Sequence, residues 1–145
     1  MFRSIVVGTD GSATAARAVE AAARLARENG ARLHIVTAYS TAVPALAAAS
    51  GVALPEHVLG PQVQQAVADQ VASEARDTHC HGVPTEVHAV HRPAPDAIVE
   101  VAEMLDADLI VVGSKGMTGA RRVLGSVPNS VAHSAPCAVL IVKTA

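Results

Sequence analysis

The sequence predicts a three-layer α/β fold, in which a doubly wound parallel sheet of five strands lies between two layers of helices. Apolar β-favouring runs alternate with helical patterns along the chain, in the order β-α-β-α-β-α-β-α-β. Such alternation is typical of parallel sheets with right-handed crossovers. Half of the 145 residues are apolar, yet the chain has only one Phe, one Tyr and no Trp. An aliphatic core of this kind suits strands that are covered on both faces.

The first quarter of the chain contains two expected strands and a helix. Residues 3–8 form the first strand, and the turn from Gly8 to Ser12 ends in a helix-capping Asp or Ser. Alanines and charged residues alternate with a 3.6-residue period over residues 13–28, which predicts an amphipathic helix. Asn29-Gly30 is a helix stop signal, and residues 32–38 form the second strand.

The middle of the chain is less regular. Tyr39 to Gly60 has neither a clear period nor charge between its prolines and glycines, so we expect a long connection or a mobile flap. A helix follows over residues 61–79 and ends before Gly82. Apolar and polar residues alternate over residues 85–91, which indicates an edge strand with one wetter face.

The last part of the chain completes the alternation in a single domain, residues 1–145, with no visible repeat or second core. Asp96 is expected to cap a helix whose apolar stripe has a helical spacing, with Ile98, Val101, Ala102 and Leu105. Residues 109–112 form the fourth strand and residues 126–134 a short helix, which Pro136 stops. Residues 137–143 form the fifth strand, with Cys137 as a small buried residue within it.

Composition excludes several classes of protein. A net charge of −2 argues against general binding of nucleic acids, which usually requires a basic domain. Two cysteines, Cys80 and Cys137, are too few for a disulfide framework and fit a reducing compartment. Because the sequence shows no signal peptide and no apolar run that could span a bilayer, we expect a cytoplasmic protein without membrane contact.

A glycine-rich stretch between the fourth strand and the last helix is the strongest functional signal. It carries Gly113, Gly116, Gly119 and Gly125, it leads into a helix start at Ser126, and no acid lies between Gly113 and Val131. A strand, a glycine-rich loop and a helix N-terminus together cradle a phosphate with backbone N–H groups. The sequence therefore predicts an anionic ligand such as a nucleotide.

Asp10 belongs to the second candidate loop. If the first and fourth strands are neighbours at the point where the strand order reverses, both loops face one crevice. Asp10 could then contact a ribose or a metal ion, or it could simply shape a helix-capping turn. Neither G-x-x-x-x-G-K-[ST] nor a G-x-G-x-x-G after the first strand is present, which argues against a P-loop NTPase and a standard dinucleotide-binding domain.

These motifs resemble those of the universal stress protein family, in its ATP-binding branch. The resemblance rests on Gly113-x-x-Gly116 with Gly125-Ser126, on the start Ile5 to Ser12, and on the ending Ser134 to Lys143. It covers nearly the whole chain. Eight residues, Met117 to Leu124, separate Gly116 from Gly125, where the family motif G-x2-G-x9-G-[ST] has nine.

The resemblance implies a fold of the adenine nucleotide alpha hydrolase type, with strand order 3-2-1-4-5, and a bound ATP with or without Mg²⁺. Carried over by position, the phosphate and ribose contacts would be Gly113, Gly116, Gly125 and Ser126, with a backbone N–H from Val127. Thr9 and Asp10 would lie along the adenosine, and Ala38 would offer backbone groups to the adenine edge. Lys115 and Arg121 could contribute charge to the phosphates or could be solvated.

Three functions remain open from the sequence. The first is a stress or regulatory protein that binds ATP, signals to an unknown protein partner and hydrolyses ATP slowly at most, because no water-activating group is evident and no catalytic residue can be assigned. The second is an ATP-hydrolysing or nucleotidyl-transferring enzyme that uses Asp10 and Mg²⁺. The third is an interaction module that binds no nucleotide.

Two further expectations concern a dimer and metals. The last strand, Ala138 to Val142, is apolar on both faces, and at a sheet edge its free hydrogen-bonding side would be covered by a second copy. The resemblance also implies a homodimer through this strand. No metal site is predicted, because the adjacent residues His79-Cys80-His81 at a helix end rarely form a closed coordination set.

Overall fold

The computed structural model describes residues 1–39, 61–114 and 126–144 and confirms the predicted three-layer α/β fold. Strands and helices alternate along these described residues, with nine elements in all: β1 (Ser4–Gly8), α1 (Ala13–Asn29), β2 (Arg32–Tyr39), α3 (Pro61–His79), β3 (Thr85–His91), α4 (Ala94–Met104), β4 (Leu109–Gly113), α5 (Ser126–Ser134) and β5 (Ala138–Val142). The predicted connection beyond Tyr39, and the part of the glycine-rich loop from Lys115 to Gly125, lie outside the described residues.

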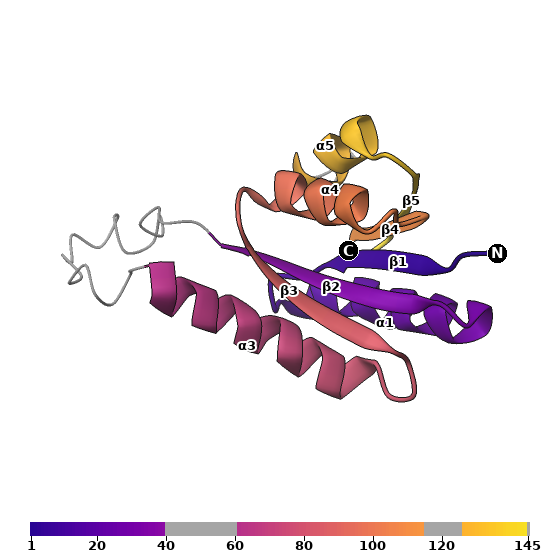
Figure 1. The fold of residues 1–145 in the computed structure, drawn as a ribbon, viewed down its shortest axis with the longest axis horizontal. Helices are drawn as coiled ribbons and strands as arrows, with labels where there is room; N and C mark the ends of the chain where they lie inside the picture. The colour runs from indigo at the N-terminus through magenta and orange to yellow at the C-terminus, as the bar shows by residue number, and fades with distance from the viewer. Residues whose placement is uncertain (40–60, 115–125, 145) are drawn as a thin grey trace.

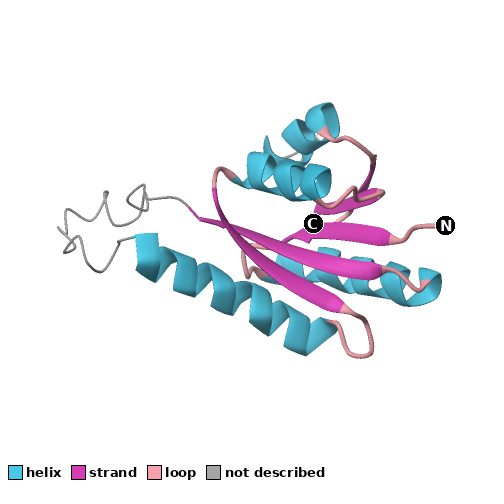
Figure 2. Cartoon of the chain, in the orientation of Figure 1, coloured by secondary structure: helices cyan, strands magenta, loops and turns pink. Residues whose placement is uncertain are grey.

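The sheet has five parallel strands in the order β3-β2-β1-β4-β5, as the resemblance implied. Its central strand is β1, which pairs with β2 on one side, Val6 opposite His34, and with β4 on the other, Val6 opposite Ile110. Figure 2 shows the strands as one twisted layer between the helices. The direction in which successive strands are added reverses at β1, so the carboxyl ends of β1 and β4 flank the switch point.

Two hydrophobic clusters cover the two faces of the sheet. Helices α1 and α3 lie on one face and α4 and α5 on the other (Figure 1). Alternate residues of each strand point to opposite faces, so Ile5 and Val7 pack toward α1 while Val6 packs toward α4. All three are fully buried. This two-sided burial explains why the central strands consist of continuous aliphatic residues.

Helix α1 packs closely on the sheet because its buried face consists almost entirely of alanine: Ala18, Val19, Ala22, Ala23 and Ala26. The Ser12 side chain caps its first turn by accepting a hydrogen bond from the Ala15 N–H, at 3.1 Å. At the other end Gly30 has φ 64°, a left-handed conformation that glycine adopts without steric cost. The predicted helix and its stop signal are therefore confirmed.

The predicted cap of α4 is wrong. Asp96 lies inside the first turn, and the N-cap is Pro93, which makes no side-chain capping bond. Prolines suit the first helical positions, where their missing N–H is not needed, so the helix begins before Asp96. Ile98, Val101 and Ala102 are buried as predicted. Leu105 lies just beyond the helix and is partly buried.

The two edge strands differ in character. The alternating strand β3 is an edge strand, as predicted. At the opposite edge, β5 is less buried than an apolar strand would suggest, and Leu140 is 38% exposed. Cys137 precedes β5 and is half-buried, so the expectation that it lies buried within the strand is wrong.

Within the described part of the chain, no helix has the length and apolarity needed to cross a membrane.

Burial predicts which valines stabilise this sheet. Val111 in β4 is fully buried, whereas Val67 on α3 is 56% exposed. We expect Val111→Ala to lower the free energy of unfolding by roughly 2 kcal/mol, because it removes two buried methyl groups and leaves a cavity. The matched variant Val67→Ala should change it by less than about 0.5 kcal/mol. Urea denaturation measures both, and equal effects would contradict this account of the core.

Candidate ligand-binding site

A cleft of about 450 Å³ opens at the carboxyl ends of the central strands. Gly8 ends β1, Ala38 lies near the end of β2, and Gly113 ends β4. The cleft is lined by residues of β1, β2, β4, α1, α4 and α5, of the turn after β1 and of the segment after β5. They are Gly8, Thr9, Asp10, Ser12, Thr14, Ala15, Val36, Ala38, Ala94, Ile98, Val112, Gly113, Ser126, Val127, Pro128 and Thr144. The cleft thus lies where doubly wound sheets place their ligands.

Three helices begin at this cleft. Ser12 caps α1, Ala94 is the first residue of α4, and Ser126 is the first residue of α5, and all three residues line the cavity. A helix N-terminus carries a partial positive charge and unpaired N–H donors. Their convergence favours an anion. Other parts of the wall are aliphatic, with Val36 and Ile98 as examples, so the cleft joins an anion-attracting region to an apolar one.

The turn after β1 is held by its own hydrogen bonds. Asp10 Oδ1 accepts a hydrogen bond from the Ser12 N–H at 2.9 Å, and Thr9 Oγ1 accepts one from the Gly11 N–H at 3.1 Å. The Thr9 N–H donates to the Val36 carbonyl at 2.9 Å, which ties the turn to β2. The interpretation of this turn as helix-capping is therefore confirmed, with Ser12 as the cap and the carboxylate of Asp10 shaping the turn.

The opposite wall depends on the end of the chain. The Ser114 N–H donates to the Val142 carbonyl at 2.8 Å, and Ser114 Oγ accepts from the Thr144 N–H at 3.0 Å. A Cβ added at Gly113 would lie 3.0 Å from Thr144 Cγ2, so glycine permits this close approach. Thr144 Oγ1 is buried and has no hydrogen-bond partner among the described residues. Because Thr144 lines the cleft, its hydroxyl is a candidate ligand contact.

Six of the predicted site residues line this cleft together: Thr9, Asp10, Ala38, Gly113, Ser126 and Val127. The other three, Lys115, Gly116 and Gly125, lie outside the described residues. Sequence reasoning missed Ala94, Ile98 and Thr144. One feature of the sequence could have indicated Thr144, because this residue follows the carboxyl end of the strand next to β4.

The histidine and cysteine residues at the end of α3 have ordinary structural surroundings. His79 Nδ1 lies 3.4 Å from Glu20 Oε1. The Cys80 thiol is buried, and this burial raises its pKa, which disfavours the thiolate that binds metals. Within the described residues, the side chains whose ligand atoms converge are instead His34, Glu86 and His88. They come from two strands and share no sequence motif.

Fold and cleft together define the class: a doubly wound α/β domain with a ligand cleft at its switch point. The profile of the Universal stress protein family matches residues 1–143, and the chain belongs to this family. The universal stress protein YxiE of Bacillus subtilis (strain 168) is 33% identical over 150 residues, which cover 99% of this chain and 100% of the relative. Rv1636 of Mycobacterium tuberculosis (strain ATCC 25618 / H37Rv) is 35% identical over 145 residues, covering 99% and 97%.

Solved structures of the family agree with the fold. A universal stress protein in complex with cAMP superposes with a TM-score of 0.74 at 34% identity, covering 99% of this chain and 98% of that one. The universal stress protein of Archaeoglobus fulgidus in complex with dAMP gives a TM-score of 0.60 at 26% identity, covering 98% of both chains. Both relatives thus bind adenine nucleotides.

The capping bond at the cleft should contribute measurably to stability. Ser12→Ala removes the acceptor for the Ala15 N–H, so we expect the free energy of unfolding to fall by about 1 kcal/mol. Ser12→Asp keeps an acceptor at the same position and should restore most of this loss. Thermal and urea unfolding of the three proteins measure the effect. A Ser12→Ala protein as stable as the parent would show that the cap contributes nothing.

Proposed function

We propose that this protein binds ATP, with or without Mg²⁺, in the cleft at the carboxyl ends of β1 and β4. The observation that carries the proposal is the convergence of three helix N-termini on a cleft whose other wall is aliphatic. Phosphates suit the first region and an adenine ring the second. Structures of relatives with cAMP and dAMP support an adenine nucleotide as the ligand.

In the proposed complex the phosphates lie against the start of α5, where Ser126 offers a hydroxyl and Val127 a backbone N–H. Gly113, at the end of β4, lines the same part of the cleft. Gly116, Gly125 and Lys115 belong to the same proposed phosphate loop and lie outside the described residues.

The adenosine occupies the other part of the cleft. Ala38 presents backbone groups of β2 to the adenine edge, and Thr9 and Asp10 lie along the ribose. The small side chain of Ala38 leaves room for the ring, with Val36 and Ile98 as apolar neighbours in the wall.

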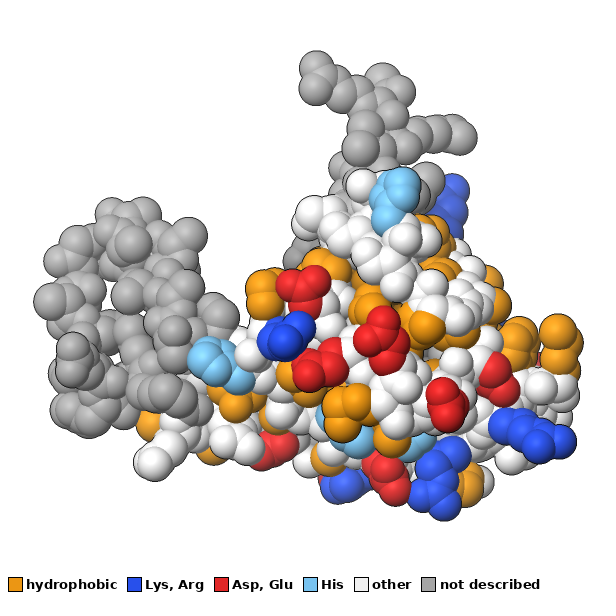
Figure 3. Space-filling model, turned by 45° about the horizontal axis from the view of Figure 1, so that its top comes forward, with side chains coloured by type: hydrophobic (Ala, Val, Ile, Leu, Met, Phe, Trp, Pro, Cys, Tyr) orange, Lys and Arg blue, Asp and Glu red, His pale blue; other side chains and the backbone are white. Residues whose placement is uncertain are grey.

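We further propose that the protein is a cytoplasmic regulator whose nucleotide state is read by a protein partner, and that it is not an efficient enzyme. The carboxylate of Asp10 accepts the Ser12 N–H through Oδ1, which gives it a role in forming the turn after β1. Nucleic acid is not expected as a partner, given the net charge of −2. Figure 3 agrees, since acidic and basic side chains are interspersed over the described part of that face.

Nucleotide binding can be tested with a matched pair of serines on one helix. Ser126 begins α5 at the cleft and Ser134 ends it. Calorimetric titration should show saturable binding of ATP to the parent, with and without Mg²⁺. Ser126→Ala should weaken it about tenfold, the effect of losing one hydrogen bond to a charged phosphate. Ser134→Ala should leave the affinity unchanged.

The same titration with ADP, AMP and cAMP ranks the adenine nucleotides. A protein that binds none of them would refute the proposed function. Multiple-turnover release of phosphate that Asp10→Asn abolishes would instead support the enzymatic alternative.

We also propose that the protein is a homodimer through β5, Ala138 to Val142. The strand lies at the edge of the sheet, and its residue Leu140 is 38% exposed. Pairing with β5 of a second copy would satisfy the free edge of the strand and cover this side chain.

Arginine substitutions on two exposed apolar side chains test this dimer. Leu140→Arg places a charge in the proposed interface and should convert the dimer to a monomer in sedimentation equilibrium. Met104→Arg, on the α4 surface where Met104 is 75% exposed, should leave the dimer intact. A parent protein that is monomeric at all concentrations would overturn the proposal.

A further inference from the structure

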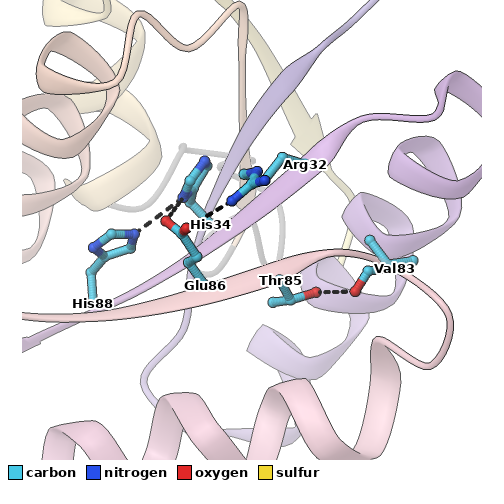
Figure 4. Close-up of polar contacts among 6 residues, drawn as sticks. All are labelled: Arg32, His34, Val83, Thr85, Glu86 and His88. Atoms are coloured by element: carbon cyan, nitrogen blue, oxygen red, sulfur yellow. Dashed lines mark hydrogen bonds and ion pairs between the residues drawn. The ribbon is translucent and has the colours of Figure 1, made fainter.

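A polar cluster lies on β2 and β3, at His34 near the amino end of β2 and at Glu86 and His88 on β3. His34 stands opposite Glu86 in the parallel register, and Val36 stands opposite His88. Residues two apart on a strand share a face, so the three polar side chains lie on the face that α4 and α5 cover. Figure 4 shows them with their polar atoms directed toward one another.

The distances within this cluster match those between ligands of one metal ion. His34 Nδ1 lies 3.1 Å from His88 Nε2 and 3.4 Å from Glu86 Oε2. One ligand atom from each of the three residues lies within 4.8 Å of the others. In a tetrahedral zinc site with bonds of about 2.0–2.1 Å, neighbouring ligand atoms are about 3.3 Å apart.

We propose that His34, Glu86 and His88 form a binding site for a divalent transition-metal ion, with Zn²⁺ as the ion that fits best. His34 Nδ1, His88 Nε2 and Glu86 Oε2 supply three ligands. Two imidazoles and one carboxylate suit Zn²⁺ better than Mg²⁺ or Ca²⁺, which prefer oxygen ligands. Glu86 is half-exposed, so water completes the coordination and the ion has a path to the site.

The burial of His34 favours its neutral form. His34 is 3% exposed, and this burial lowers its pKa, with a further contribution from the neighbouring His88. A neutral imidazole is the form that binds a metal ion. The hydrogen bond between the two rings requires one of them to donate, and metal binding moves that proton to the other nitrogen of the same ring.

Arg32 positions the carboxylate. Its Nη1 lies 2.8 Å from Glu86 Oε1, which leaves Oε2 directed at His34. Such a partner to a ligating carboxylate is a usual part of metal sites. The guanidinium group also balances the carboxylate charge, so the cluster is close to neutral before the ion binds.

The proposed metal site is separate from the nucleotide cleft. On β2, His34 lies two residues from Val36 and four residues from Ala38, both of which line the cleft, and the second separation is about 13 Å at the rise of a parallel strand. None of the three proposed ligands lines the cleft, so an ion bound by them uses different side chains from a nucleotide there. The ion links the edge strand β3 to β2, and because only the folded chain brings the three ligands together, it stabilises the fold.

Zn²⁺ titration of the chelator-treated protein tests the proposal. Competition with a chromophoric chelator should show one ion bound per chain, and added Zn²⁺ should raise Tm. His88→Gln and Glu86→Gln should each weaken binding at least about tenfold and abolish the rise in Tm. Glu86 is half-exposed, so its variant is expected to fold, and circular dichroism checks this.

His91→Gln is the matched control, because His91 is an exposed histidine on the same strand and stacks on Tyr39. It should bind Zn²⁺ as the parent does. A second control, His81→Gln, tests the triplet at the end of α3. Binding that is lost in either control and kept in His88→Gln would place the ion elsewhere and overturn the proposal.

Nuclear magnetic resonance of the imidazole nitrogens gives a readout that needs no variant. In the zinc-bound protein we expect His34 to be coordinated at Nδ1 and His88 at Nε2, with each proton on the opposite nitrogen. Weak binding of several ions without saturation, or ring nitrogens that Zn²⁺ leaves unchanged, would show that the cluster is only a hydrogen-bonded network.

Discussion

The position of β1 between β2 and β4 is the constraint on which the rest of the structure depends. Its residues Ile5, Val6 and Val7 are fully buried and pair with strands on both sides. The helix after β1 packs on one face of the sheet, and the helix after β4 packs on the other (Figure 1). The starts of these two helices therefore lie on opposite faces of the sheet beside adjacent strand ends, and residues of both helices line the ligand cleft.

Asp108 secures this central pairing at the opposite end of the strands. Its carboxylate accepts the N–H groups of Arg3 at 2.8 Å and Ser4 at 3.2 Å, and its own N–H donates to the Ser4 carbonyl at 3.0 Å. The start of β4 is thus bound to the start of β1. A one-residue slip would turn every side chain of β4 to the wrong face, so these bonds and the aliphatic pattern specify the same register.

The scaffold leaves its two ends chemically different. At the carboxyl ends of the strands, helix N-termini and backbone groups create a region suited to an anion. Toward the amino ends of β2 and β3, two imidazoles and a carboxylate create a region suited to a metal cation. The preference for an anion depends on the direction of the helices, which any doubly wound sheet provides. The preference for a cation depends on which residues this chain places on adjacent strands.

The sequence by itself determined the α/β class, the order of the elements and four residues of the cleft, Thr9, Asp10, Gly113 and Ser126, because hydrophobic periods, capping residues and glycines act over short stretches. The family resemblance added Ala38 and Val127. The strand order came from the family resemblance. Local pattern misplaced the start of α4, where prolines outweigh Asp96. Only the tertiary structure brought Thr144 beside Gly113 and His34 beside His88. These contacts depend on which strands pair and in what register, and pairing between distant segments leaves no local signal in the chain.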